Sequence, residues 1–156
     1  MQIIHKRTIV EDDYLRVPED KPLADGDILI SLLRFRENQE ALSDRTGRIG
    51  VEIPNDILAE GLVKELAQVD MIAIDFPIYR DGRGFSSARI FRRSGFTGEL
   101  RATGNVLRDQ IAFMERCGFD TYEVQAGKNI QDALEGFEDF TVSYQDAHDA
   151  RTSSRS

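Results

Sequence analysis

The residues best suited to chemistry lie in one glycine- and arginine-rich segment, residues 75–93. Gly82 and Gly84 would let the backbone approach a ligand closely or adopt a positive φ. Arg80 and Arg83 supply planar guanidinium donors of the kind that bind sulfite, sulfate, phosphate or carboxylate. The segment is neither a P-loop nor a dinucleotide-binding fingerprint. It therefore predicts an oxyanion site or a docking surface, with no nucleotide implied.

A helix is expected to follow this loop, from about Ser86 to Arg93. Ser86 or Ser87 would cap it, and its free N–H groups and dipole would attract an anion. Arg89 and Arg93 stand four residues apart and share one helix face. An alternative remains open, in which the arginines only pair with neighbouring acids. The residues assigned to anion binding are Arg80, Arg83, Gly84, Ser86, Arg89 and Arg108.

Two aspartates are candidates for proton transfer. Asp75 ends the most apolar strand of the sequence, residues 71–76, and active sites of β/α proteins lie at such strand ends. Asp109 lies near a second loop, residues 103–105, one strand later. For Asp75 the alternative is structural, with its carboxylate bound to loop amides or to a nearby arginine.

Arg108 is expected in the first turn of a helix over residues 106–117. A cation there opposes the helix dipole, so it should have a partner such as Asp75, Asp81 or a bound anion. Gln110 falls within the apolar stripe of the same helix. A buried amide must find hydrogen bonds or cost stability, which makes Gln110 either a satisfied core amide or a functional group.

The chain offers little for redox or metal chemistry. Cys117, the sole cysteine, is predicted to be a buried, inert thiol, and it excludes an intrachain disulfide. His5 and His148 lie in the terminal segments, so no metal site is predicted. No flavin, nicotinamide, haem or iron–sulfur motif is present, and the cofactor, if any, is left unknown.

These residues require an α/β scaffold to position them. About five strands alternate with helices, which predicts a mostly parallel sheet, either Rossmann-like or an open part of a β/α barrel. Residues 1–26 are read as a β-hairpin lead-in, 27–147 as the α/β domain and 148–156 as a disordered polar tail. The expected strands are 28–33, 49–53, 71–76, 99–103 and 121–124, and the expected helices are 37–43, 57–66 capped by Asn55 or Asp56, 86–93, 106–117, and a last one capped by Asn129.

Composition narrows the function classes. At 156 residues the chain has the usual length of one domain, and no apolar run is long enough to cross a membrane. The lone cysteine and the lack of a signal-peptide pattern favour the cytoplasm. The formal charge of −8 argues against nucleic-acid binding. Residues 71–118 nevertheless carry a net +3, a basic island on an acidic chain that suits an anion or an acidic partner.

The same segments carry a family resemblance, which covers about residues 28–144 and is densest over 71–120. The chain resembles a bacterial family of small proteins of unknown function, encoded beside the sulfite reductase haemoprotein and often labelled as oxidoreductases of sulfite reduction. The family often has a lysine at Ile78 and an acid at Asn105, which shifts weight to Arg83, Ser86, Arg108 and Asp109. The matching stretches are Ile74–Pro77, Asp81–Ser86, Gly98–Ala102, Val106–Gln110 and Arg116–Asp120.

Three functions follow. The resemblance implies an accessory or electron-transfer-related protein of assimilatory sulfite reduction, which binds an oxyanion or docks on sulfite reductase or its electron donor. A small enzyme acting on a phosphorylated or sulfonated metabolite is the first alternative, with Asp75 or Asp109 as acid–base group and Arg83 and Arg108 holding the anion. The second alternative is a non-catalytic structural subunit. A phosphate or sulfate bound beside Asp75 in a closed pocket would favour the enzyme, and a shallow basic face without a pocket would favour docking.

Overall fold

The computed structural model describes residues 1–78 and 82–148, with side chains as far as Asp139. The predicted polar tail lies outside this range apart from His148. The strands are β1 (Gln2–His5), β2 (Thr8–Glu11), β3 (Leu15–Arg16), β4 (Ile28–Ser31), β5 (Ile49–Pro54), β6 (Met71–Phe76), β7 (Glu99–Gly104) and β8 (Thr121–Tyr122). The helices are α1 (Leu32–Glu37), α2 (Gln39–Ser43), α3 (Arg83–Arg93), α4 (Ile111–Cys117) and α5 (Ile130–His148), with one 3₁₀ turn, η1 (Ala59–Gly61).

All eight strands form one sheet in the order β2-β1-β8-β7-β6-β5-β4-β3. Neighbours from β3 to β8 pair in parallel, whereas β1 pairs antiparallel with both β8 and β2. The prediction of about five mostly parallel strands is therefore wrong in number and type, because the N-terminal hairpin and β3 join the same sheet. The strand order follows the chain without the reversal of a Rossmann sheet, as in a β/α barrel.

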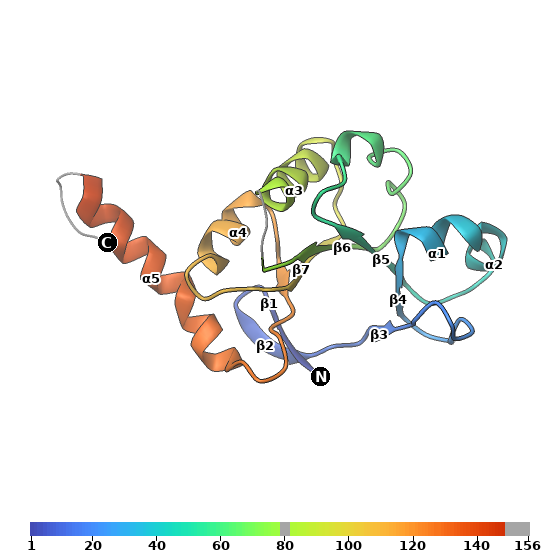
Figure 1. Cartoon of the computed structure of the whole chain (residues 1–156), viewed down its shortest axis with the longest axis horizontal. Coiled ribbons are helices and arrows are strands. Elements are labelled where there is room, and N and C mark those ends of the chain that lie inside the picture. Colours follow the sequence, from blue (N-terminus) through green and yellow to red (C-terminus); the bar gives the residue numbers. More distant parts are fainter. Residues whose placement is uncertain (79–81, 149–156) are drawn as a thin grey trace.

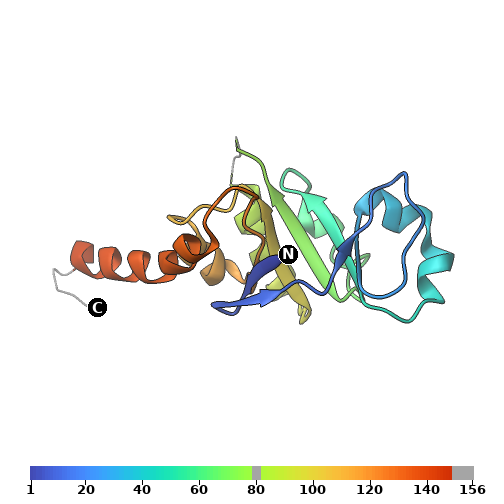
Figure 2. The same cartoon turned by 90° about the horizontal axis from the view of Figure 1, so that it is seen from below.

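The two edges of this sheet come from adjacent pieces of chain. β2 ends at Glu11 and β3 begins at Leu15, so only residues 12–14 connect the edges. Four Cα steps span at most about 14 Å, and the sheet must curl to bring its edges that close. Figures 1 and 2 show the result, with α1 to α4 on one side and the N-terminal segment crossing the other. We call these the convex and the concave face.

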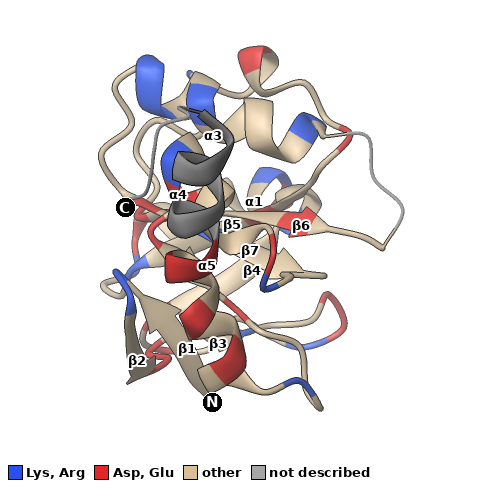
Figure 3. Cartoon of the chain, turned by 90° about the vertical axis from the view of Figure 1, so that its left-hand side faces the viewer, with Lys and Arg blue, Asp and Glu red and all other residues tan. Residues whose placement is uncertain are grey.

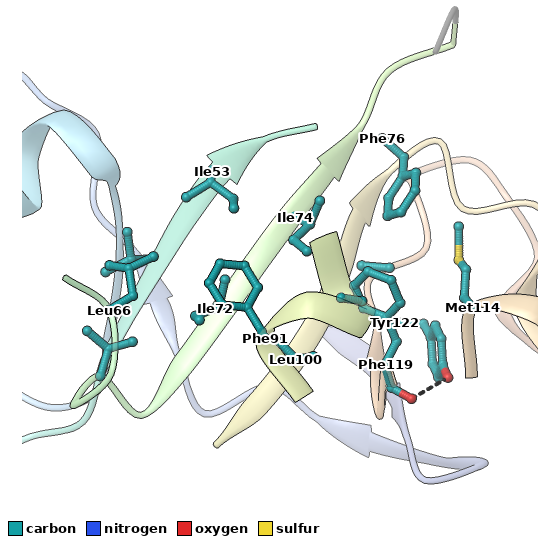
Figure 4. Packing of buried hydrophobic residues seen from close by; sticks show 14 of the residues in the cluster. Ile53, Leu66, Ile72, Ile74, Phe76, Phe91, Leu100, Met114, Phe119 and Tyr122 are labelled. Carbon is teal, nitrogen blue, oxygen red and sulfur yellow. Dashed lines mark hydrogen bonds between the residues drawn. The ribbon is translucent and has the colours of Figure 1, made fainter. Parts of the chain in front are cut away.

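The alternation of each strand separates the two faces. In β6, Ile72, Ile74 and Phe76 belong to the main core beneath the helices, whereas Met71 and Ala73 pack with Tyr14 and Leu29 on the concave side. Figure 4 shows the main core, where the Tyr122 hydroxyl donates to the Phe119 carbonyl at 2.9 Å. The convex face is apolar because helices cover it, and the concave face is free to carry charge.

Several predicted helices begin or end elsewhere, for local reasons. Residues 57–66 contain only η1 and turns, which still bury Ala59, Leu62 and Leu66. Residues 106 and 107 have no regular structure and residues 108–110 are turns, so the predicted helix over 106–117 begins at Ile111. The strand predicted to run to Leu33 stops at Ser31, whose Oγ accepts from the Arg34 amide and caps α1. The Asn129 cap of α5 is confirmed, with its Oδ1 accepting from the amides of residues 131 and 132.

Candidate functional site

A charged cavity opens on the concave face where the parallel strands end, and we call it the mouth cavity. Its volume is about 430 Å³, within the range of small-molecule sites. Because strands with a common direction end at the same rim, residues far apart in sequence meet there. The lining residues are Arg16, Glu52, Ile53, Pro54, Asp75, Thr103, Gly104 and Glu123.

Arg16 holds two of the carboxylates in the mouth cavity. Its guanidinium donates to Glu52 and, at 2.8 Å, to Glu123 Oε1. The second Glu52 oxygen accepts from the Thr103 hydroxyl at 2.7 Å. The Arg16 guanidinium and the Thr103 hydroxyl therefore both donate to glutamates. These hydrogen bonds fix the positions of the side chains at the rim, and the charge of Arg16 is neutralised.

Asp75 lies in the same cavity, but its carboxylate is not part of this hydrogen-bond network. Within the described part of the chain, no hydrogen-bond donor or cation contacts its carboxylate. A Cβ on Gly104 would lie 2.5 Å from Asp75 Oδ1, so the glycine makes room for this carboxylate, and both residues line the cavity. Burial raises the pKa of Asp75, the Glu52 carboxylate raises it further, and the Arg16 guanidinium opposes the shift. Carboxyl groups whose pKa is shifted in this way occur often at functional sites.

Arg101 lies deeper on the concave face and is 1% exposed. It donates to both Asp12 oxygens at 2.8 and 2.9 Å, to Glu99 at 3.1 Å and to Glu123 at 3.4 Å. Its guanidinium also lies 5.4 Å from the centroid of the Tyr14 ring. Arg101 thus ties the N-terminal segment across the concave face and supports Glu123 from below.

The start of α3 differs from the prediction. Gly82, with φ 88°, precedes the helix, and no side chain caps it, so Ser86 and Ser87 lie inside the helix. Gly84 is buried in the first turn, where a Cβ would lie 2.7 Å from the Phe76 ring and 3.4 Å from Asn55 Cβ. Gly84 is required here for close packing against the end of β6. Arg80 lies outside the described residues.

Four arginines of α3 and α4 are exposed, and we call them together the basic face: Arg83, Arg89, Arg93 and Arg116. Arg89 and Arg116 lie 5.3 and 5.8 Å from the Phe113 ring centroid, so the two helices join through this ring. Arg83 donates to the Asp56 carbonyl at 3.2 Å. In Figure 3, red acidic segments mark α5, and blue segments gather above it in this view. None of these arginines lines the mouth cavity.

Arg108 has a partner that the sequence did not indicate. Its guanidinium contacts three carboxylates of α5, Asp132, Glu135 at 3.6 Å and Asp139 at 2.6 Å. These contacts attach α5 to the turn after β7. Arg108 lies in this turn and not in the first turn of a helix, so its charge does not oppose a helix dipole, and the acids of α5 are its partners. Asp109, the other proton-transfer candidate, is exposed beside Arg108 and lines a separate groove with Lys128 and Asn129.

Gln110, Asn55 and Cys117 carry polar groups that are buried in the interior. Gln110 stands at the N-cap of α4, and its buried Oε1 has no hydrogen-bond partner among the described residues. The same is true of the Nδ2 of Asn55. Cys117 is buried, and burial raises the pKa of its thiol, consistent with the inert role predicted for it. No group of three or more His, Cys, Asp or Glu side chains in the described ranges could hold a metal ion.

The structure therefore separates the predicted site residues into three places. Asp75 lies in the mouth cavity, the residues of α3 lie on the opposite, helix-covered side, and Arg108 with Asp109 lies by α5. Sequence reasoning missed the residues that surround Asp75. One signal could have found two of them, because Glu52 and Thr103 interrupt the apolar pattern of β5 and β7 on the sheet face that carries Asp75.

The fold and the cavity define a class, a small β/α protein with a curled sheet and a charged site at the carboxyl ends of its strands. Comparison with known proteins gives the family. The model of a bacterial protein family of unknown function, DUF934, matches residues 50–154, and the chain belongs to this family. Neither the curated proteins nor the solved structures gave a match. No helix among the described residues is long and apolar enough to cross a membrane.

Proposed function

We propose that this chain is an accessory protein of assimilatory sulfite reduction that docks through the basic face on an acidic partner, sulfite reductase or its electron donor. The observation that carries docking is the arrangement of Arg83, Arg89, Arg93 and Arg116. All four are exposed, on two helices that meet at Phe113, and none of them lines the mouth cavity. The sulfite context comes from the family resemblance of residues 71–120.

Electrostatics support this choice of partner. The basic face belongs to a segment with net charge +3, on a chain whose formal charge is −8. A basic patch on an acidic protein orients an acidic partner and repels contact elsewhere, which speeds correct association. Phe113 adds an aromatic surface between Arg89 and Arg116, and aromatic and arginine side chains are enriched at binding hot spots.

The test is a binding measurement with purified sulfite reductase haemoprotein at low and moderate salt. The double variant Arg89→Glu/Arg93→Glu should weaken binding by about tenfold or more, because two attractive charges become repulsive. The control Lys21→Glu/Lys64→Glu makes the same charge change at exposed lysines outside the basic face. Equal loss in both variants would mean a non-specific charge effect. No binding by the unmodified protein, to the reductase or to its electron donor, would refute the docking proposal.

One observation favours a second candidate, an oxyanion site at the start of α3. The buried Asn55 Nδ2 lacks a described partner beside the first helical turn, which has no side-chain cap. Calorimetry with sulfite and sulfate tests it. Arg83→Ala should weaken binding of the anions while leaving the melting temperature nearly unchanged. Arg93→Ala, a change at a residue that the docking test also alters, should leave anion binding unchanged. Unaltered affinity in Arg83→Ala would reject this site.

A further inference from the structure

The mouth cavity carries more negative charge than its own cation can balance. Glu52 and Glu123 are both bound by Arg16. The buried Arg101 also contacts Glu123, at 3.4 Å, but its charge is shared with Asp12 and Glu99, so the glutamates still outweigh the cations. Asp75 adds a third carboxylate without a described partner. The cavity is open to solvent, so the imbalance can be corrected by a molecule that enters it.

From this we propose that the mouth cavity binds a small organic cation, an alkylammonium or an amidinium-type group, with the Asp75 carboxylate as its counter-ion. The proposal is independent of the basic face, because none of the arginines of that face lines this cavity. It also assigns a different ligand class, since an anion placed here would face three carboxylates and a guanidinium that is already engaged.

The geometry around Asp75 supports this assignment. In the sheet Asp75 stands between Pro54 and Thr103 on the adjacent strands. The Thr103 hydroxyl is directed to Glu52, so it does not satisfy Asp75. Gly104 leaves room for Oδ1 of Asp75, because a Cβ there would lie 2.5 Å from this oxygen, and both residues line the cavity. A cation that donates hydrogen bonds would complete an acceptor that the protein has left open.

The charge of Asp75 also predicts a pH dependence. The charged groups that face it are Glu52 from β5, Glu123 after β8 and Arg16 from β3. Burial and the two glutamates raise its pKa, so acidification protonates Asp75 while an exposed carboxyl would still be ionised. Affinity for the cation should therefore fall as pH falls through this raised pKa, because the neutral acid no longer attracts it.

The test uses four probes with one alkyl chain: butylamine, butylguanidine, butanol and butyrate. Amide shifts in ¹H–¹⁵N NMR spectra of the full chain report weak binding and also confirm the fold. The two cations should shift the amides of residues 103 and 104 saturably, and butanol and butyrate should not. Asp75→Asn should abolish the effect, whereas Glu60→Gln, which removes a charge from the exposed η1, should leave it unchanged.

Three results would overturn the proposal. They are equal shifts from butanol or butyrate, no shifts from either cation, and shifts by the cations that persist in Asp75→Asn. The comparison of the four probes needs only the unmodified chain, so the proposal stays testable even where a variant folds poorly. Lowering the pH in the same titration should reduce the affinity for butylamine, and a constant affinity would count against Asp75 as the counter-ion.

Discussion

Two arginines on the concave face serve different purposes. Arg16 lies in the mouth cavity with a side chain that is 46% exposed, whereas the Arg101 side chain is 1% exposed. Burying a guanidinium costs free energy unless carboxylates pair with it closely. Arg101 meets that condition with Asp12, Glu99 and Glu123, so its role is to hold the interior together. Arg16 is accessible, and its role is to shape the cavity.

Replacing Arg101 by methionine should destabilise the fold by about 3–5 kcal/mol, because the substitution leaves buried carboxylates without a partner. Urea unfolding at neutral pH measures this change. Arg36→Met is the matched control, since Arg36 pairs with Glu65 at the surface and such pairs contribute at most about 1 kcal/mol. Similar losses in the two variants would contradict the structural role assigned to Arg101.

Among the helices, α5 packs closely against the turn after β7. A Cβ on Gly136 would lie 2.2 Å from the Arg108 carbonyl oxygen and 2.9 Å from Ile111 Cγ2. The helix can approach this closely only because residue 136 lacks a side chain. Arg108 then holds the same helix by its contacts to Asp132 and Asp139. Arg108, which the sequence suggested as an anion-binding residue, thus joins α5 to the turn after β7.

Gly136→Ala should therefore destabilise the protein, although alanine favours a helix by about 1 kcal/mol over glycine. We expect a net loss of about 1–3 kcal/mol from overpacking, with faster hydrogen exchange in α5. Gly61→Ala is the control, because nothing lies within 4 Å of the position a Cβ would take there. A gain in stability for Gly136→Ala would mean that α5 does not pack as described.

At the scale of the whole molecule, the N-terminal segment supplies both edges of the sheet. β1 pairs with β8, and β3 pairs with β4 at the far edge. Between them, Asp12 binds Arg101, 89 residues away in sequence. These contacts link residues 1–16 to most of the strands, so the segment contributes to the stability of the entire sheet.

Deleting residues 1–13 should accordingly lower the melting temperature of the whole chain and broaden its transition. The deletion removes the β1–β8 pairing and leaves Arg101 buried without its closest carboxylate. Thermal unfolding followed by circular dichroism measures this effect. A truncated chain with unchanged, cooperative unfolding would show that the rest of the sheet is stable without β1 and β2.

Part of the architecture is determined locally, and there the sequence sufficed. β6 is a continuous apolar run because it is covered on both faces, and Asn129 starts α5 because its side chain satisfies two free amides. The alternation of strands and helices likewise indicated an α/β fold. These features depend on residues within a few positions of one another, so a local pattern is enough to predict them.

The rest was decided by the tertiary structure. Curling of the sheet brings Arg16, Glu52 and Asp75 into one cavity with Glu123, although they span 108 residues of the chain. It also sends the arginines of α3 to the opposite side, away from Asp75. No local pattern contains this information, because which residues face each other depends on strand order, register and the closeness of the two sheet edges.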